Sequence, residues 1–301
     1  MKIMKYHNPV FLERSVECLV TDINGVYVDV TFGGGGHSRK ILEKISIKGK
    51  LFAFDQDGDA LKNKLIDARF KLIHSNFINL KKFLKFYGVK SVDGIIADFG
   101  VSSYQFDTKN RGFSIRLDGP LDMRMNRKTT LTAFHVVNEY SEKKLIQVLR
   151  EYGEIKKSSK LVSKILESRR SNPIKTTGQL VRIIKKIIPS RFINKYAAQV
   201  FQAIRIEVNQ ELDFIKEMLK QSSELLRSNG RLVCITYHSL EDRIVKKYIL
   251  DGVFDGLAIT DIYGNRDVPL KKLGKFEIPT KEEIIVNTRS RSAKLRIAEK
   301  I

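Results

Sequence analysis

The sequence contains no tryptophan, only two cysteines and six prolines, and no apolar run that approaches the length of a membrane span. Cys18 and Cys234 lie far apart, which excludes a disulfide framework and a paired-cysteine metal site. No two of the five histidines lie within four residues of each other, so the helical histidine pair of many zinc sites is also excluded. These absences predict a soluble cytoplasmic protein with no metal centre and no membrane partner.

Positive charge is abundant and unevenly placed. The 301 residues include 55 Lys and Arg against 34 Asp and Glu, a net charge of +21. Residues 141–200 hold 15 basic and 4 acidic residues, so one fifth of the chain carries over half of that excess. A charge run is often only a solvated helix face. Such a concentration favours a polyanionic partner, most simply a nucleic acid. The sequence leaves the oligomeric state, monomer or dimer, open.

The first hundred residues alternate between strand and helix patterns, which is typical of βαβ units. With right-handed crossovers this predicts an α/β fold with a doubly wound parallel sheet. The expected strands are 26–32, 50–57, 71–74 and 93–99, and the expected helices are 37–45, 59–65 and 80–87.

The alternation stops after Phe99. A loop rich in Gly, Asp and Arg is expected over 100–127, followed by helical patterns that include one from Gln210 to Leu226. The run 231–237 again resembles a sheet strand. We therefore predict a discontinuous sheet domain, 1–105 and 205–301, interrupted by an inserted helical domain, 106–204, that holds the basic window.

A glycine loop follows the first expected strand in the segment YVDVTFGGGGHS, 27–38. Glycines let the backbone turn sharply and let a ligand approach its N–H groups, and a following helix presents its positive end to an anion. About twenty residues later the second expected strand ends in Phe54-Asp55-Gln56-Asp57, where an acid such as Asp55 can accept the hydroxyls of a ribose.

This pattern is compatible with three kinds of cofactor site and with an ordinary glycine turn. A dinucleotide site requires a third glycine where Ser38 stands, and a P-loop requires a lysine after the glycines. A site for S-adenosylmethionine needs the loop and the acid but no grip on a pyrophosphate. Asp98, at the end of the apolar fourth strand, faces the crevice where open α/β sheets bind ligands, and Gln105 lies just beyond it.

Seven stretches in order along the chain resemble the ribosomal RNA small subunit methyltransferase H family. RGFSIRLDGPLDMRM and GRLVCITYHSLEDRIVK are long and specific. The sequence departs from the family pattern at Tyr104, Ile115 and Thr288. The matching stretches are 7–19, 27–42, 93–107, 111–125, 200–212, 230–246 and 288–300.

The resemblance implies a class I, Rossmann-like methyltransferase fold with an inserted helical domain that helps to recognise substrate. It implies methylation of the exocyclic N4 of a cytosine in 16S rRNA of the small ribosomal subunit, with S-adenosyl-L-methionine as cofactor. Carried over position by position, the cofactor contacts are Gly35, Gly36, His37, Asp55, Phe77, Asp98 and Gln105.

The residues offer three aspartates as the proton acceptor for N4. Asp98, or the carbonyls beside it, is the first candidate, and Asp118 and Asp122 are alternatives. His238 suits either a base or a helix N-cap. Two other functions stay open: a DNA amino-methyltransferase, against which the missing proline pair after Asp98 argues, and a non-catalytic RNA-binding or ribosome-assembly protein.

Overall fold

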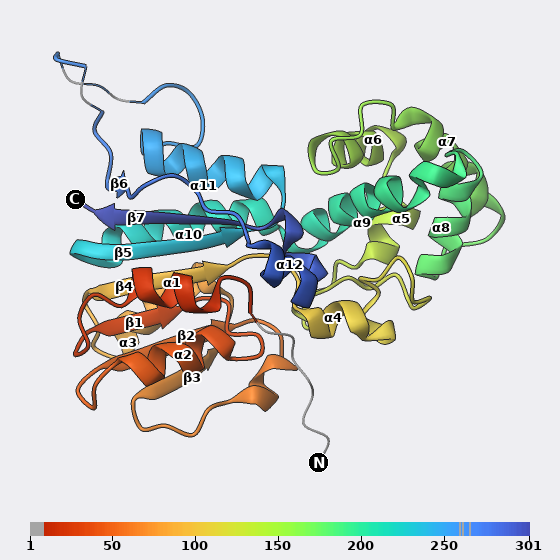
Figure 1. Cartoon of the computed structure of the whole chain (residues 1–301). Helices are drawn as coiled ribbons and strands as arrows, with labels where there is room; N and C mark the ends of the chain where they lie inside the picture. The colour runs from red at the N-terminus through yellow and green to blue at the C-terminus, as the bar shows by residue number, and fades with distance from the viewer. Residues whose placement is uncertain (1–8, 259, 261, 265) are drawn as a thin grey trace. The chain divides into compact units, whose positions relative to one another are not determined.

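The computed structural model describes residues 9–258, 260, 262–264 and 266–301. His7 and Asn8, which open the first family-like stretch, lie outside the described residues. The chain divides into two compact units (Figure 1): Met1–Gly100 with Leu212–Ile301, called here the sheet unit, and Val101–Glu211, called the helical unit. The insert predicted over 106–204 falls within the helical unit.

The sheet unit contains a seven-stranded sheet in the order β3-β2-β1-β4-β5-β7-β6. Neighbours among the first five strands pair in parallel, whereas β7 is antiparallel to both β5 and β6. This is the α/β class that the sequence predicts. The antiparallel pairing of β7 at one side of the sheet was not predicted. The strands are β1 Val26–Asp29, β2 Lys50–Asp55, β3 Phe70–His74, β4 Val92–Asp98, β5 Leu226–Thr236, β6 Leu270–Lys272 and β7 Lys294–Lys300.

Helices cover both faces of this sheet because successive strand residues point to opposite sides. Tyr27 and Ile96 belong to the core cluster that includes α1 and α2, and Val28 and Ile95 belong to the cluster that includes α3, α10 and α11. Among the described residues no helix is both long enough and apolar enough to cross a bilayer. The helices are α1 Leu12–Leu19, α2 Gly36–Lys44, α3 Leu80–Phe86, α10 Glu211–Leu225, α11 Ser239–Asp251 and α12 Lys281–Val286.

The helical unit has its own core, to which α5, α6, α7, α8 and α9 contribute Val136, Leu149, Leu161, Leu180 and Ile204. Its α9 is long and half apolar, and it was not predicted from the sequence. The helices are α4 Ser103–Asp107, α5 Ala133–Glu139, α6 Glu142–Glu151, α7 Ser159–Ser171, α8 Thr177–Lys185 and α9 Ile193–Asn209.

Several predicted elements differ in extent. The helix expected at 59–65 is one 3₁₀ turn, η1 Ala60–Asn63, because Ala60 is its only buried residue and the segment has no apolar face to pack. The loop expected at 100–127 contains α4 and the 3₁₀ turn η3, Lys109–Arg111. The helix expected from Gln210 to Leu226 is α10, which ends at Leu225 because Leu226 already pairs with Val92 of β4.

Asn209, at the end of α9, fastens the loop before α5. Its side chain accepts a hydrogen bond from Met125 N and donates to Met123 O, at 2.7 and 2.8 Å. Met123 has a φ of 58°, a conformation that side chains rarely adopt, so this loop depends on contacts of this kind.

Replacing Asn209 with Ala should lower the free energy of unfolding by about 1–3 kcal/mol, because Met125 N would lose its partner in a buried place. Urea unfolding followed by circular dichroism measures the loss. Asn194→Ala, at an exposed position of the same helix, is the matched control and should change stability by less than about 0.5 kcal/mol. Equal effects of the two substitutions would contradict the fastening role of Asn209.

Candidate active site

Three aspartates end three adjacent strands of the sheet unit. Asp29 ends β1, Asp55 ends β2 and Asp98 ends β4. Because β1 pairs in parallel with both β2 and β4, the three side chains lie at one edge of the sheet, called here the carboxyl edge. Burial raises the pKa of Asp29 to about 6 and the pKa values of Asp55 and Asp98 to about 7. Carboxyl groups that titrate near neutrality are typical of functional sites.

Asp29 holds the glycine loop to the end of β1. Its carboxylate accepts hydrogen bonds from Ser38 Oγ at 2.7 Å and from Thr31 N at 3.0 Å. The bond to Thr31 also explains why the strand ends at Asp29 rather than continuing to Phe32 as predicted. Ser38, which breaks the dinucleotide pattern, is therefore the residue that ties α2 to β1.

The glycines of the loop serve conformation and close contact. Gly35 has a φ of 74° and stands at the N-cap of α2 without a side-chain cap. At Gly36 a Cβ atom would lie 2.1 Å from Cγ of Pro9, so only glycine fits there. The first turn of α2 thus presents backbone N–H groups at the carboxyl edge with no capping side chain over them, which suits an anionic group.

Asp55 already has two backbone donors. Its carboxylate accepts from Gly33 N and from Asp57 N, both at 2.8 Å. Phe77 begins η2, Phe77–Asn79, just after β3, and its half-buried ring meets Phe99 edge to face with centroids 6.4 Å apart. Asp55 is thus the last residue of β2, and Phe77 comes shortly after β3, which pairs with β2 in parallel and ends at the same edge.

Asp98 is paired with a tyrosine that the sequence analysis did not select. Tyr237 follows β5, and its hydroxyl donates to Asp98 Oδ1 at 2.8 Å. Its backbone N–H donates to Glu241 Oε2 at 2.8 Å, which fixes its position. Burial raises the pKa of Tyr237 well above its usual range, so the tyrosine stays neutral and acts as a donor. Asp98 Oδ2 receives no hydrogen bond from any described residue.

His37 approaches that second oxygen. Its Nδ1 lies 4.0 Å from Asp98 Oδ2, and its Nε2 lies 3.2 Å from Val10 O. Burial lowers the pKa of His37 to about 4, so the ring is neutral at pH 7. Since Val10 O can only accept, the ring proton belongs on Nε2, and Nδ1 turns a lone pair toward Asp98.

His238 caps a helix. It is the N-cap of α11, where its Nδ1 accepts from Glu241 N at 3.4 Å and the Glu241 carboxylate accepts from His238 N at 3.3 Å. Of the two roles that the sequence allowed, the geometry favours the cap over the base.

The three remaining predicted residues lie in the helical unit. Gln105 forms a capping box in α4, accepting from Ser102 N at 3.0 Å. Asp118 accepts from Gly178 N at 2.8 Å, and that bond lowers its pKa. Burial raises the pKa of Asp122, but a bidentate pair with Arg124 outweighs it and leaves the pKa below its usual value. Both aspartates thus have structural partners inside this unit.

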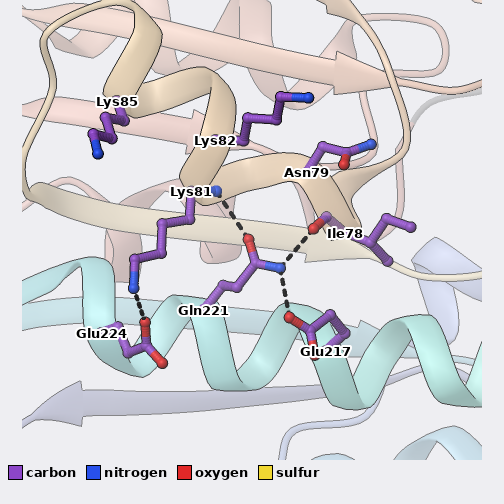
Figure 2. A pocket seen from close by; sticks show the side chains of 8 residues that line it. All are labelled: Ile78, Asn79, Lys81, Lys82, Lys85, Glu217, Gln221 and Glu224. Carbon is purple, nitrogen blue, oxygen red and sulfur yellow. Dashed lines mark hydrogen bonds and ion pairs between the residues drawn. The ribbon is translucent and has the colours of Figure 1, made fainter.

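A surface hollow lies between α3 and α10 (Figure 2), but it contains none of the predicted site residues. The Gln221 amide joins the two helices by accepting from Lys81 N and donating to Ile78 O and Glu217, while Lys81 pairs with Glu224. The polar groups that line the hollow bond mainly to one another. The hollow is therefore a contact region between α3 and α10 and not the cofactor site.

A family model described as the MraW methylase family matches residues 4–301. The chain belongs to this family. It is 56% identical to a ribosomal RNA small subunit methyltransferase H of Flavobacterium johnsoniae over 99% of each chain. It is 53% identical to a protein of the same description from Christiangramia forsetii over the full length of both. A putative rRNA methylase from Clostridium thermocellum is a weaker structural match, with 14% identity, a TM-score of 0.42 and coverage of 92% and 89%.

As a member of the MraW methylase family the chain is a methyltransferase, and its carboxyl edge is the candidate active site. Two residues at the carboxyl edge, Asp29 and Tyr237, were not predicted as site residues from the sequence. Asp29 lies inside a β-branched run, although an acid four residues before a glycine loop is a usable signal. Tyr237 gave no signal, because its place beside Asp98 depends on the pairing of two strands far apart in the chain.

Tyr237→Phe should raise the pKa of Asp98 above its value of about 7, because the tyrosine hydroxyl stabilises the carboxylate form. Carbon NMR titration of labelled aspartate measures the shift. Because the folded pKa of Asp98 lies above its unfolded value, this group favours folding at low pH and costs stability progressively as the pH rises from about 4 to about 7. In Tyr237→Phe the pH range over which this stability is lost should extend to higher pH. Tyr248→Phe, which removes a hydroxyl bonded to Ser223, is the control and should leave Asp98 unchanged.

Proposed function

We propose that this methyltransferase transfers a methyl group from S-adenosyl-L-methionine to the exocyclic N4 of a cytosine in 16S rRNA of the small ribosomal subunit. The observation that carries the proposal is the carboxyl edge itself, with one buried and two partly buried aspartates and an uncapped helix start, in a chain of the methylase family. The descriptions of the two relatives support the RNA substrate.

The chemistry of the donor set suits the cofactor. The first turn of α2, at Gly36 and His37, would hold the methionine carboxylate, and the Asp55 carboxylate would take the ribose hydroxyls. Phe77 would line the adenine. Anionic Asp98 would also favour a cationic ligand, which agrees with its predicted place in the cofactor site. The contact predicted for Gln105 stays a prediction.

The chain must position two reactants and remove a proton. S-adenosylmethionine supplies an electrophilic methyl group on a sulfonium. Holding donor and acceptor in line is worth on the order of 7–11 kcal/mol of the barrier. The N4 lone pair of cytosine is delocalised into the ring, so an acceptor for the N4 hydrogens is needed to localise it.

Asp98 Oδ2 is the atom best suited to that role. Oδ1 is occupied by the Tyr237 hydroxyl, whereas Oδ2 faces the neutral Nδ1 of His37. In its carboxylate form Asp98 would accept a hydrogen bond from N4 and take the proton that N4 must lose as the new N–C bond forms, while the methyl–sulfur bond breaks and its electron pair stays on the sulfur of the leaving thioether. Asp118 and Asp122 are weaker candidates, because both are engaged by donors within the helical unit.

The helical unit is proposed to hold the RNA backbone. The strongly basic window 141–200 lies within it, and many of its lysines, including Lys156, Lys157 and Lys160, are exposed. Phosphate contacts position an RNA without reading its sequence, so the base itself has to enter the site splayed from its stack. We place the enzyme in the cytoplasm with the ribosomal subunits.

The function is tested by incubating the protein and labelled cofactor with unmethylated small subunits, free 16S rRNA and DNA, and then identifying the modified nucleoside. N4-methylcytidine in the RNA supports the proposal. Label in DNA would indicate the DNA amino-methyltransferase. RNA binding without any label would indicate a non-catalytic assembly protein.

Asp98→Asn should lower the single-turnover rate of methyl transfer by at least about 100-fold, because the amide cannot accept the proton. Single-turnover assays at saturating cofactor separate this from binding. Asp118→Asn and Asp122→Asn are run beside it. Loss of transfer in either of those, with wild-type turnover in Asp98→Asn, would move the acceptor to the helical unit.

Binding of small-subunit RNA should weaken steeply with salt, because each phosphate that the protein neutralises releases counterions. Filter binding between 50 and 200 mM salt gives the slope of log K against log salt. A slope close to zero would contradict the proposed role of the basic window.

A further inference from the structure

The segment before the last strand lies at the carboxyl edge. Because β7 runs antiparallel to β5, its first residue, Lys294, pairs with Thr236 at the end of β5, next to Tyr237. The residues just before β7 are therefore close to the side chain that holds Asp98. They form α12, Lys281–Val286, and the 3₁₀ turn η5, Thr288–Ser292. We call residues 281–292 the edge segment.

One hydrogen bond joins the edge segment to the N-terminal part of the sheet unit, and another closes a turn within the segment itself. Glu283 of α12 accepts a hydrogen bond from Phe11 N, and the adjacent Val10 O accepts from the His37 ring in the glycine loop. In η5 the fully buried Ser290 donates to Asn287 O at 2.7 Å. The segment is thus bound to the same short stretch of chain that supports the cofactor loop.

The opposite side of the edge segment is exposed. Ile285 and Val286 are 79% and 68% exposed, and Arg289 and Arg291 are exposed on either side of the buried Ser290. Two bare aliphatic side chains beside two arginines, next to a candidate active site, have the composition of a binding surface rather than of a solvated face.

The charge of the chain indicates which kind of partner the edge segment binds. A second copy of this chain, with its net charge of +21, would bring like charges together. A single-stranded RNA offers phosphates for exposed arginines and flat apolar base faces for exposed aliphatic side chains.

We propose that the edge segment is a contact surface for single-stranded rRNA beside the site of methyl transfer, with Arg289 and Arg291 on phosphates and Ile285 and Val286 against a base. This inference rests on the proposed function and adds the residues that would present the target strand to the carboxyl edge.

The test compares paired substitutions by equilibrium binding to unmethylated small subunits at several salt concentrations. The double variant Arg289→Ala with Arg291→Ala should raise Kd roughly tenfold and reduce the magnitude of the salt slope by about 1.4, since each phosphate on a single strand contributes about 0.7. The matched control is Lys48→Ala with Lys90→Ala. These exposed lysines precede β2 and β4 at the other edge of the sheet, so their loss should leave the slope unchanged.

Two further variants separate charge from structure. Arg289→Lys with Arg291→Lys keeps the charge and should retain the wild-type salt slope. Ile285→Asn with Val286→Asn should weaken RNA binding without changing the slope. Cofactor affinity and the melting temperature should match the wild type in all variants.

An unchanged Kd and slope in the alanine pair would overturn the inference. So would a reduced slope in the lysine pair equal to that in the alanine pair, because the arginines would then act through folding. Failure of the wild-type protein to bind or label any small-subunit RNA is a different result, and it would count against the proposed function itself.

Discussion

The parallel pairing of β1 with β2 and β4 is the constraint on which the site depends. It forces the three aspartates that end these strands, Asp29, Asp55 and Asp98, to one edge, where burial opposes their ionisation. Asp29 and Asp55 each receive two short hydrogen bonds that stabilise the charged form. The Asp98 side chain receives only the one from Tyr237 among the described residues. The carboxylate with the fewest donors is thus the one best able to take a proton from a substrate.

The same constraint explains the glycine loop. A chain that leaves β1 and starts α2 within a few residues must turn sharply, and it must do so against Pro9 and under the carboxylate of Asp55. Side chains on Gly35 or Gly36 would collide with Phe32 or Pro9. The turn that glycine allows is also the turn that leaves the first N–H groups of α2 without a capping side chain, so the geometry that the fold requires is also one that suits an anion.

Much of this could be predicted from sequence, because apolar strands and a glycine loop are local patterns. The placement of Asp55 and Asp98 in the last residues of their strands, the helix after the loop and the helical character of the insert all follow from spacing over a few residues. The α9 helix was missed because its caps are weak: it starts after Phe192 without a side-chain cap and ends at Gln210 in a left-handed conformation. Tyr237 could not be found because strand register is set by the whole sheet and not by neighbouring residues.

The path of the chain between β4 and β5 ties the site to the folding of the insert. Asp98 and Tyr237 lie on, or just after, adjacent strands, yet the chain leaves the sheet unit at Gly100 and returns at Leu212. Joining two strands across so long a loop costs entropy that grows with the logarithm of the free loop length. A helical unit with its own core shortens that free length, because its two ends are held by a compact body rather than by a flexible chain. Compared with a flexible loop of the same length, the insert therefore lowers the entropic cost of pairing β4 with β5, and with it the cost of forming the Tyr237–Asp98 hydrogen bond.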